Sequence, residues 1–206
     1  MRIFRPIKTD KLSQGFGQSL ACERVVPPFN IVRKTGDLCP AGYGDFYKRR
    51  NMKGHNGVDS KTWHGEPVYF PVEAETEWYA VNGGDPDGGL GVDIVSLSPI
   101  EGIYRKFRFW HFLRGAVEDD ERIKLGQLIG YADSTGKSSA DHLHWAMKNC
   151  DDLGRTLNRD NGYAGSVDFT PWYENKFVLD VLNLRPVPLT VAEMLAKLSF
   201  NLRNLA

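Results

Sequence analysis

The sequence has no excess of charge of either sign, and it contains no long apolar run. Its 206 residues include 26 Lys and Arg and 26 Asp and Glu, so the formal net charge is zero. Proteins that bind nucleic acid through counterion release usually carry a basic excess, and we therefore expect no nucleic-acid partner. No apolar stretch approaches the roughly 18 to 20 residues that a helix needs to cross a bilayer, so we expect no membrane span.

Cysteine is scarce, and the three cysteines form no metal or redox motif. They are Cys22, Cys39 and Cys150, and no C-x-x-C pair is present. Cys22 and Cys39 lie in one loop-like segment and could pair, which would leave Cys150 unpaired. The first residues are positively charged but lack an apolar core, so no signal peptide is visible and reduced thiols are expected.

The rest of the composition is that of a globular protein rich in turns. Hydrophobic residues make up 41 % of the chain, and 21 Gly and 11 Pro favour turns and short strands. No helical period separates the stretches of period two, which predicts a mainly β fold with one compact antiparallel β-sheet and long loops. The strands are predicted at residues 12–17, 66–70, 77–81, 92–97, 105–112, 125–132 and 142–147.

Two segments stand outside this pattern of strands. Residues 18–53 are rich in proline and glycine and are longer than an ordinary connection, which indicates an insertion. Near the C-terminus, Thr190 and Glu193 form a capping box before apolar residues at helical spacing, which predicts an amphipathic helix at about 190–204. We expect this helix to pack on its own domain. The alternative is that it docks on a partner or a larger particle.

Two of the five histidines lie in the segment DHLHWAM, residues 141–147. If the segment is a strand, His142 and His144 share one face and lie about 6.6 Å apart, while Leu143 and Trp145 share the other. The two imidazoles are then close enough to converge on one ion or one substrate atom.

A third histidine lies in GHNGVD, residues 54–59, where His55 and Asp59 are four residues apart. The glycines disfavour a helix, and a straight strand would separate the two side chains by about 13 Å. We therefore expect a bent loop-to-strand segment that brings them together.

A fourth histidine lies in RKFRFWHF, residues 105–112. As a regular strand, this segment places His111 on the same face as Phe107 and Phe109. Burial there would favour the neutral imidazole, which can accept or donate a proton.

Together the three segments supply two imidazole nitrogens and a carboxylate oxygen for a metal, with two more imidazoles nearby. Three such ligands and one open position are typical of catalytic zinc, whereas structural zinc more often has four ligands that include cysteine. Zinc lowers the pKa of its water to near 7, and neighbouring histidines can move protons. The residues predict metal-assisted hydrolysis without identifying the bond that is cleaved.

The order and spacing of several motifs resemble those of the lysostaphin-type zinc endopeptidases, which cut peptidoglycan peptides. The resemblance extends from about residue 11 to residue 173. It implies a peptidase domain over 1–173, with 18–53 as a long insertion, and a C-terminal appendage over 174–206. The motifs are SQGFG (13–17), GHNGVD (54–59), GEPVYFP (65–71), WHFL (110–113) and LGQLIGYADSTGKSSADHLHW (125–145).

The resemblance also implies a role for each of five residues. His55, Asp59 and His144 correspond to the ligands of one Zn²⁺, which carries a bound water as the nucleophile. His142 and His111 correspond to the two catalytic histidines beside the metal.

Some residues depart from the family pattern or have no part in it, and Phe109 and Phe112 replace the tyrosine and leucine that the family usually has around His111. Asp141 stands where the family usually has proline or a small residue, and strand alternation turns it away from His142. His64 matches no family role, and we expect it to be a surface or turn residue.

The predicted function is that of a zinc-dependent endopeptidase acting on stem or cross-bridge peptides of peptidoglycan. The alternative is a non-catalytic zinc-binding or regulatory module on the same fold, although such relatives would be expected to have lost ligands. Because no signal peptide is visible, we expect the chain to be made in the cytoplasm. It would then act on the cell wall after release, as a phage lysin or a virion component, or through an unseen export route.

Overall fold

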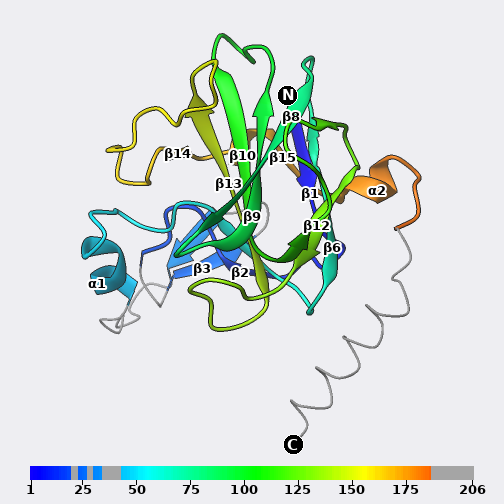
Figure 1. Cartoon of the computed structure of the whole chain (residues 1–206). Helices are drawn as coiled ribbons and strands as arrows, with labels where there is room; N and C mark the ends of the chain where they lie inside the picture. The colour runs from blue at the N-terminus through cyan, green and yellow to red at the C-terminus, as the bar shows by residue number, and fades with distance from the viewer. Residues whose placement is uncertain (20–22, 27–29, 34–42, 187–206) are drawn as a thin grey trace, which may run out of the picture.

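The computed structural model describes residues 1–19, 23–26, 30–33 and 43–186 of the chain, and this part is mainly β (Figure 1). The helices are short: α1 (Tyr43–Lys48), the 3₁₀ helix η1 (Thr170–Trp172) and α2 (Val178–Val181). The strands are β1 (Arg2–Arg5), β2 (Leu12–Gln14), β3 (Glu23–Val26), β4 (Asn30–Arg33), β5 (Val58–Lys61), β6 (Glu66–Tyr69), β7 (Val72–Glu73), β8 (Trp78–Asp85), β9 (Gly89–Ser96), β10 (Tyr104–Gly115), β11 (Arg122–Ile123), β12 (Leu128–Ala132), β13 (His142–Cys150), β14 (Ser166–Val167) and β15 (Tyr173–Phe177).

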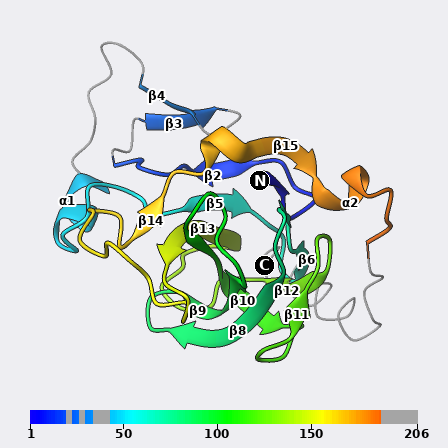
Figure 2. The ribbon, with the colours of Figure 1, turned by 90° about the horizontal axis from the view of Figure 1, so that it is seen from above.

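Ten of the strands form one antiparallel sheet, which confirms the predicted fold class. The main path of the sheet runs β11-β8-β9-β10-β13-β5-β2, and these strands follow one another across the molecule in Figure 2. The long strand β10 pairs with β9 and β13 along most of its length and with β12 near its end. All seven predicted strands are present, although β2 ends at Gln14 and β12 begins at Leu128.

A second, three-stranded sheet has the order β15-β1-β7, and its β1–β15 pair is parallel. No pattern in the sequence predicted β1. Its apolar residues Ile3 and Phe4 are adjacent, and both are fully buried, Ile3 in the main core and Phe4 in a second cluster. A strand buried on both faces shows no alternation, so its four residues carry no period-two signal.

The main core lies under one face of β10 and β13, where alternate side chains point inward. Phe107, Phe109, Leu143, Trp145 and Met147 are all fully buried in it. This is the pattern expected of strands with one apolar face. The opposite face of the same two strands carries polar side chains, and it forms the floor of an open groove.

Several predictions concern the two segments outside the strand pattern. Within 18–53, the described residues form the β3–β4 hairpin and α1. Beyond residue 173, β15 and α2 pack on the rest of the protein through Phe177 and Val178.

Cys150 is free and buried. The predicted helix at 190–204 and the pair Cys22 and Cys39 lie outside the described residues.

None of the described helices has the length and apolar character needed to cross a bilayer.

Candidate metal centre

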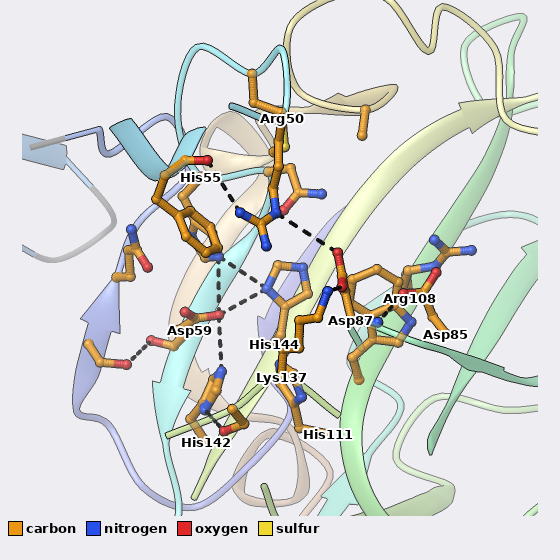
Figure 3. A pocket seen from close by; sticks show the side chains of 18 of the residues that line it. Arg50, His55, Asp59, Asp85, Asp87, Arg108, His111, Lys137, His142 and His144 are labelled. Atoms are coloured by element: carbon orange, nitrogen blue, oxygen red, sulfur yellow. Dashed lines mark hydrogen bonds and ion pairs between the residues drawn. The ribbon is translucent and has the colours of Figure 1, made fainter. Parts of the chain in front are cut away.

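Two imidazoles and one carboxylate meet at the junction of β5 and β13 (Figure 3). Asp59 lies on β5 directly opposite His144 on β13, and His55 lies in the loop that leads into β5. The His55 Nε2 atom is 3.3 Å from Asp59 Oδ1 and 3.1 Å from His144 Nδ1, and the last two atoms are 2.9 Å apart. The bent loop-to-strand segment predicted from GHNGVD is confirmed.

The triangle of ligand atoms fits a tetrahedral metal ion. Zinc binds imidazole nitrogen and carboxylate oxygen at about 2.0 to 2.2 Å, which places neighbouring ligand atoms of a tetrahedron about 3.3 Å apart. The three distances lie near that value. In addition, the His55 Nδ1–H group donates to the Gly15 carbonyl oxygen at 3.2 Å, which leaves Nε2 free to bind a metal.

The surroundings keep Asp59 and His144 in the protonation states that a metal requires. Burial by itself raises the pKa of Asp59, but the charges and hydrogen bonds of His55 and His144 outweigh it and hold that pKa well below its usual value. Burial lowers the pKa of His144 to about 4, against the opposing effect of Asp59. An ionised carboxylate and a neutral imidazole are the forms that ligate metals.

Two further histidines lie beside the triangle. The His142 Nε2 atom is 3.8 Å from Asp59 Oδ1, and the ring centroids of His142 and His111 are 4.4 Å apart. Both imidazoles are oriented by backbone carbonyl groups: His142 Nδ1–H donates to Ala140 at 2.8 Å and His111 Nδ1–H donates to Thr135 at 2.6 Å. These bonds leave both Nε2 atoms free to accept a proton.

Burial also favours the neutral form of His111. Desolvation lowers its pKa, and the nearby His142 acts in the same direction against the hydrogen bond to the Thr135 carbonyl. A neutral imidazole with one free nitrogen can act as a general base near neutral pH.

The predicted orientation of His111 is wrong in one respect. Regular alternation would place it on the apolar face with Phe107 and Phe109, but it lines the groove together with Trp110. The reason is a β-bulge: the pairing of β10 with β9 shifts register between Trp110 and Phe112, and His111 has a φ of 64°. The extra residue turns His111 outward and lets Phe112 enter the core.

The prediction for DHLHWAM is confirmed. His142 and His144 both line the groove, whereas Leu143 and Trp145 are fully buried in the core. The sequence could not show which imidazole of this pair meets Asp59. The pairing of β13 with β5 decides it, because Asp59 lies opposite His144.

His64 lies in a turn, as predicted, but it is only partly exposed. Its Nδ1 atom is 2.9 Å from Asp133 Oδ1, and Asp141 lies near both side chains. Burial raises the pKa of Asp141, and Asp133 adds to this effect.

Several residues that support the site carry no recognisable signal in the sequence. The Thr135 hydroxyl donates to the Phe112 carbonyl oxygen at 2.8 Å and accepts from the Leu90 amide at 3.1 Å, which fixes the carbonyl group that orients His111. The Trp110 ring stacks on His144 with centroids 5.3 Å apart. The roles of Thr135 and Ala140 depend on their backbone carbonyl groups, so residue type gives no signal for them.

The site opens into a groove of about 1250 Å³. Three groups that can hold a metal ion and two oriented imidazoles in an open groove are the arrangement of a metallohydrolase. The chain matches peptidase family M23 over residues 53–158, a range that contains all five histidine and aspartate residues of the site, and it belongs to that family.

Individual relatives match a limited part of the chain. The glycyl-glycine endopeptidase ALE-1 of Staphylococcus capitis is 35 % identical over 104 residues, which are 50 % of this chain and 27 % of that protein. Lysostaphin of Staphylococcus simulans is 33 % identical over 107 residues, which are 50 % of this chain and 20 % of that protein. The aligned segments thus cover only about a quarter of the length of ALE-1 and a fifth of the length of lysostaphin.

Among solved structures, the catalytic domain of lysostaphin from Staphylococcus simulans superimposes with a TM-score of 0.46 and 22 % identity. That alignment covers 79 % of this chain and 90 % of the other.

Proposed function

We propose that this protein is a zinc-dependent endopeptidase that hydrolyses peptide bonds in stem or cross-bridge peptides of peptidoglycan. The observation that carries the proposal is the buried triangle of His55, Asp59 and His144 with two oriented imidazoles beside it in an open groove. The endopeptidase activity in the name of the ALE-1 relative supports the choice of a peptide substrate. All five groups needed for catalysis are retained, which favours the enzyme over a non-catalytic module.

In this proposal His55, Asp59 and His144 hold the metal. A zinc ion supplies Lewis-acid chemistry at such a site: it acidifies a water molecule and polarises the substrate carbonyl group. The protein contributes a rigid set of ligands, because Asp59 and His144 lie on paired strands and Trp110 stacks on the His144 ring. Burial of the triangle excludes bulk water and strengthens the electrostatic interactions.

His142 and His111 carry the protons. The free Nε2 of one imidazole accepts a proton from the attacking water, and the protonated form can then donate it to the leaving amine. The second imidazole, when its Nε2 also carries a proton, donates that N–H to the carbonyl oxygen and stabilises the negative charge that develops there. The two rings can share these tasks because their centroids lie 4.4 Å apart.

The experiment that tests the proposed function is the release of new amino groups from purified peptidoglycan, with and without a zinc chelator. We expect release that stops with chelator and returns with added zinc. Mass analysis of the fragments would then identify the cleaved bond. No release from walls of several chemotypes by the zinc-loaded protein would exclude peptidoglycan as the substrate.

Two variants separate metal binding from proton transfer. We expect His144→Ala to lose both zinc and activity, because it removes a ligand. His142→Ala is expected to retain zinc and to lose about 10²-fold to 10⁴-fold in turnover, the usual contribution of a general acid or base. Zinc content by atomic absorption and turnover on solubilised peptidoglycan check both. Near-normal turnover of His142→Ala would remove His142 from the mechanism.

Action on the cell wall requires that the protein reaches it. We propose release from the cytoplasm, as in a lysin or a virion component, on the basis of the wall substrate. Detection of the protein in culture medium or in purified virions tests this location. Its confinement to intact cytoplasm would contradict it.

A further inference from the structure

The groove beyond the metal centre is strongly basic, although the whole chain has a formal net charge of zero. Among the described residues, seven Lys and Arg side chains line the groove but only four Asp side chains. One of those four is the metal-site residue Asp59. Asp87, another, forms an ion pair with Lys137 and lies 3.9 Å from Arg50. Positive charge therefore remains unbalanced elsewhere along the groove.

Two of the seven, Arg108 and Lys148, lie on the outward face of β10 and β13, beside Lys106 on the same two strands. Lys106 is paired with Lys148 across the two strands, and Arg108 is opposite Ala146. Two carboxylates act on this cluster: Asp93 accepts two hydrogen bonds of 2.7 Å from Arg108 and lies 3.3 Å from Lys106, and Asp85 adds a weaker attraction to Arg108. Three positively charged side chains thus face two carboxylates, and neither carboxylate forms an ion pair with Lys148 among the described residues.

Lys148 is the unusual member of the cluster. Its side chain lines the groove, yet the residue is only 3 % exposed. Its ammonium group donates a hydrogen bond to the carbonyl oxygen of Ala164, at 2.6 Å, and forms no ion pair with any described residue. Burial and the neighbouring charges of Arg108, Lys106 and Arg159 lower its pKa to about 7, against the opposing effect of Asp93. A buried ammonium group without a carboxylate is costly and would gain from an anionic ligand.

We propose that Lys148, Arg108 and Arg159 form a subsite that binds a carboxylate group of the peptide substrate. Arg159 is exposed on the connection between β13 and β14, lines the groove and lies close enough to Lys148 for its charge to lower the pKa of that ammonium group. Guanidinium and ammonium donors bind carboxylates through short, charge-assisted hydrogen bonds. The subsite rests on the proposed peptidase function, because it presumes that a peptide occupies the groove.

The strands also give the distance of the subsite from the metal. Ala146, opposite Arg108, and Lys148 lie two and four residues beyond His144 on the same face of β13. At about 3.3 Å per residue, these positions are roughly 7 and 13 Å along the strand from the metal ligand. An extended peptide covers the same distance in two to four residues. The preferred substrate therefore carries an acidic residue two to four positions from the scissile bond, and an uncharged glycine bridge is a poorer substrate.

A peptide series tests the subsite directly. The probes are labelled glycine heptapeptides, blocked at both ends, in which one glutamate or one glutamine is moved through all seven positions. Dissociation constants are measured by fluorescence anisotropy below pH 7 on the zinc-loaded full chain carrying His142→Ala, and kcat/KM is measured on the wild type. We expect glutamate to bind about tenfold more tightly than glutamine at one or two neighbouring positions.

Substitutions then assign the preference to the cluster. We expect Lys148→Met and the exposed substitution Arg159→Gln to bring the ratio of the two dissociation constants towards one, whereas Lys148→Arg keeps it. Lys124→Met, at an exposed lysine outside the groove, is the matched control and leaves the ratio unchanged. A merely structural role of Lys148 would weaken the glutamate and glutamine peptides equally.

The outcomes separate the two proposals. Equal binding of glutamate and glutamine at every position, or a preference that survives Lys148→Met and Arg159→Gln, overturns the subsite. Cleavage without any acidic preference overturns the subsite and leaves the peptidase function in place. An acidic preference in binding, without cleavage of any peptide or wall, supports the subsite and counts against the peptidase.

Discussion

His111 has a backbone conformation that a histidine rarely adopts. Its φ is 64°, in the left-handed region, and hydrogen bonds on both sides hold it there: its amide donates to the Gly88 carbonyl oxygen at 2.9 Å, and its carbonyl oxygen accepts from the Asp133 amide at 2.7 Å. Side chains other than glycine pay roughly 1 to 3 kcal/mol for such a conformation. This strain is what allows the imidazole to leave the apolar face and enter the groove.

We therefore predict that His111→Gly is more stable than His111→Ala by about 1 kcal/mol, because glycine relieves the strain, while both variants lose activity. Denaturant unfolding measures the difference. His142, on a regular stretch of β13, is the control: there His142→Gly should be less stable than His142→Ala. If His111→Ala matched or exceeded His111→Gly in stability, no strain would be stored at this position.

Gly57 allows the metal ligands to approach one another. A Cβ atom at this position would lie 2.6 Å from His144 Cε1 and 2.7 Å from the Trp145 carbonyl oxygen, both far too close. We predict that Gly57→Ala displaces His144, lowers zinc affinity at least about tenfold and costs about 1 to 3 kcal/mol of stability.

Competition with a zinc indicator and thermal unfolding measure the two effects of Gly57→Ala. Gly83→Ala is the matched control, because a Cβ atom there meets no other atom within 4 Å. Unchanged zinc affinity of Gly57→Ala would show that the loop can move away from His144 without disturbing the triangle.

At the scale of elements, β10 and β13 form the apolar core with one face and line the groove with the other. One face holds the aromatic core, and the other holds Trp110, His144 and the basic cluster around Lys148. Pairing of the two strands fixes the spacing between the metal centre and this cluster. The arrangement buries the ammonium group of Lys148, and its titration makes the free energy of unfolding depend on pH.

We predict that the free energy of unfolding rises with pH between about 7 and 10.5 because of Lys148. Burial and the nearby cations lower its folded-state pKa to about 7, whereas the unfolded chain binds the proton up to the ordinary value near 10.5. In that window the unfolded state carries more protons, so raising the pH favours the folded state, by about 2 to 5 kcal/mol in total.

The variant Lys148→Met isolates this effect. The stability of the wild type relative to Lys148→Met should increase as the pH rises from 7 to 10.5, measured by denaturant unfolding at several pH values. Lys124→Met, at an exposed lysine, should show no such trend. A difference between wild type and Lys148→Met that does not change with pH would show that Lys148 titrates normally.

At the scale of the whole molecule, the metal centre joins segments that are far apart in the chain. Asp59 and His144 are separated by 85 positions, and His55 comes from a loop rather than a strand. A metal that binds only the folded arrangement stabilises it by about 4 kcal/mol when its concentration is a thousand times the dissociation constant.

We predict that removing the metal with a chelator lowers the midpoint of thermal unfolding by about 10 °C, because 1 kcal/mol shifts this midpoint by roughly 2 to 4 °C for a chain of this size. Calorimetric scans with chelator, and with zinc restored, measure the shift. The variant His144→Ala is the control and should not respond to chelator. Identical midpoints with and without metal would contradict a structural contribution from the site.

The sequence by itself determined the local parts of this protein. The alternation in 142–147 placed two histidines on one face and the core on the other, and the glycines of 54–59 predicted the bend that brings His55 to Asp59. These features depend on the conformational preferences of neighbouring residues, and such preferences follow from the residue types alone. The order of the motifs was enough to indicate the family.

The tertiary structure decided the features that depend on strand pairing. The bulge at His111 arises where β10 is paired with β9 and β12, so regular alternation along β10 alone predicted the wrong face. The parallel pair of β1 and β15, and the meeting of Lys148 with Arg108, join residues distant in the chain. Such contacts depend on packing and burial across the whole molecule, and no local pattern in the sequence predicts them.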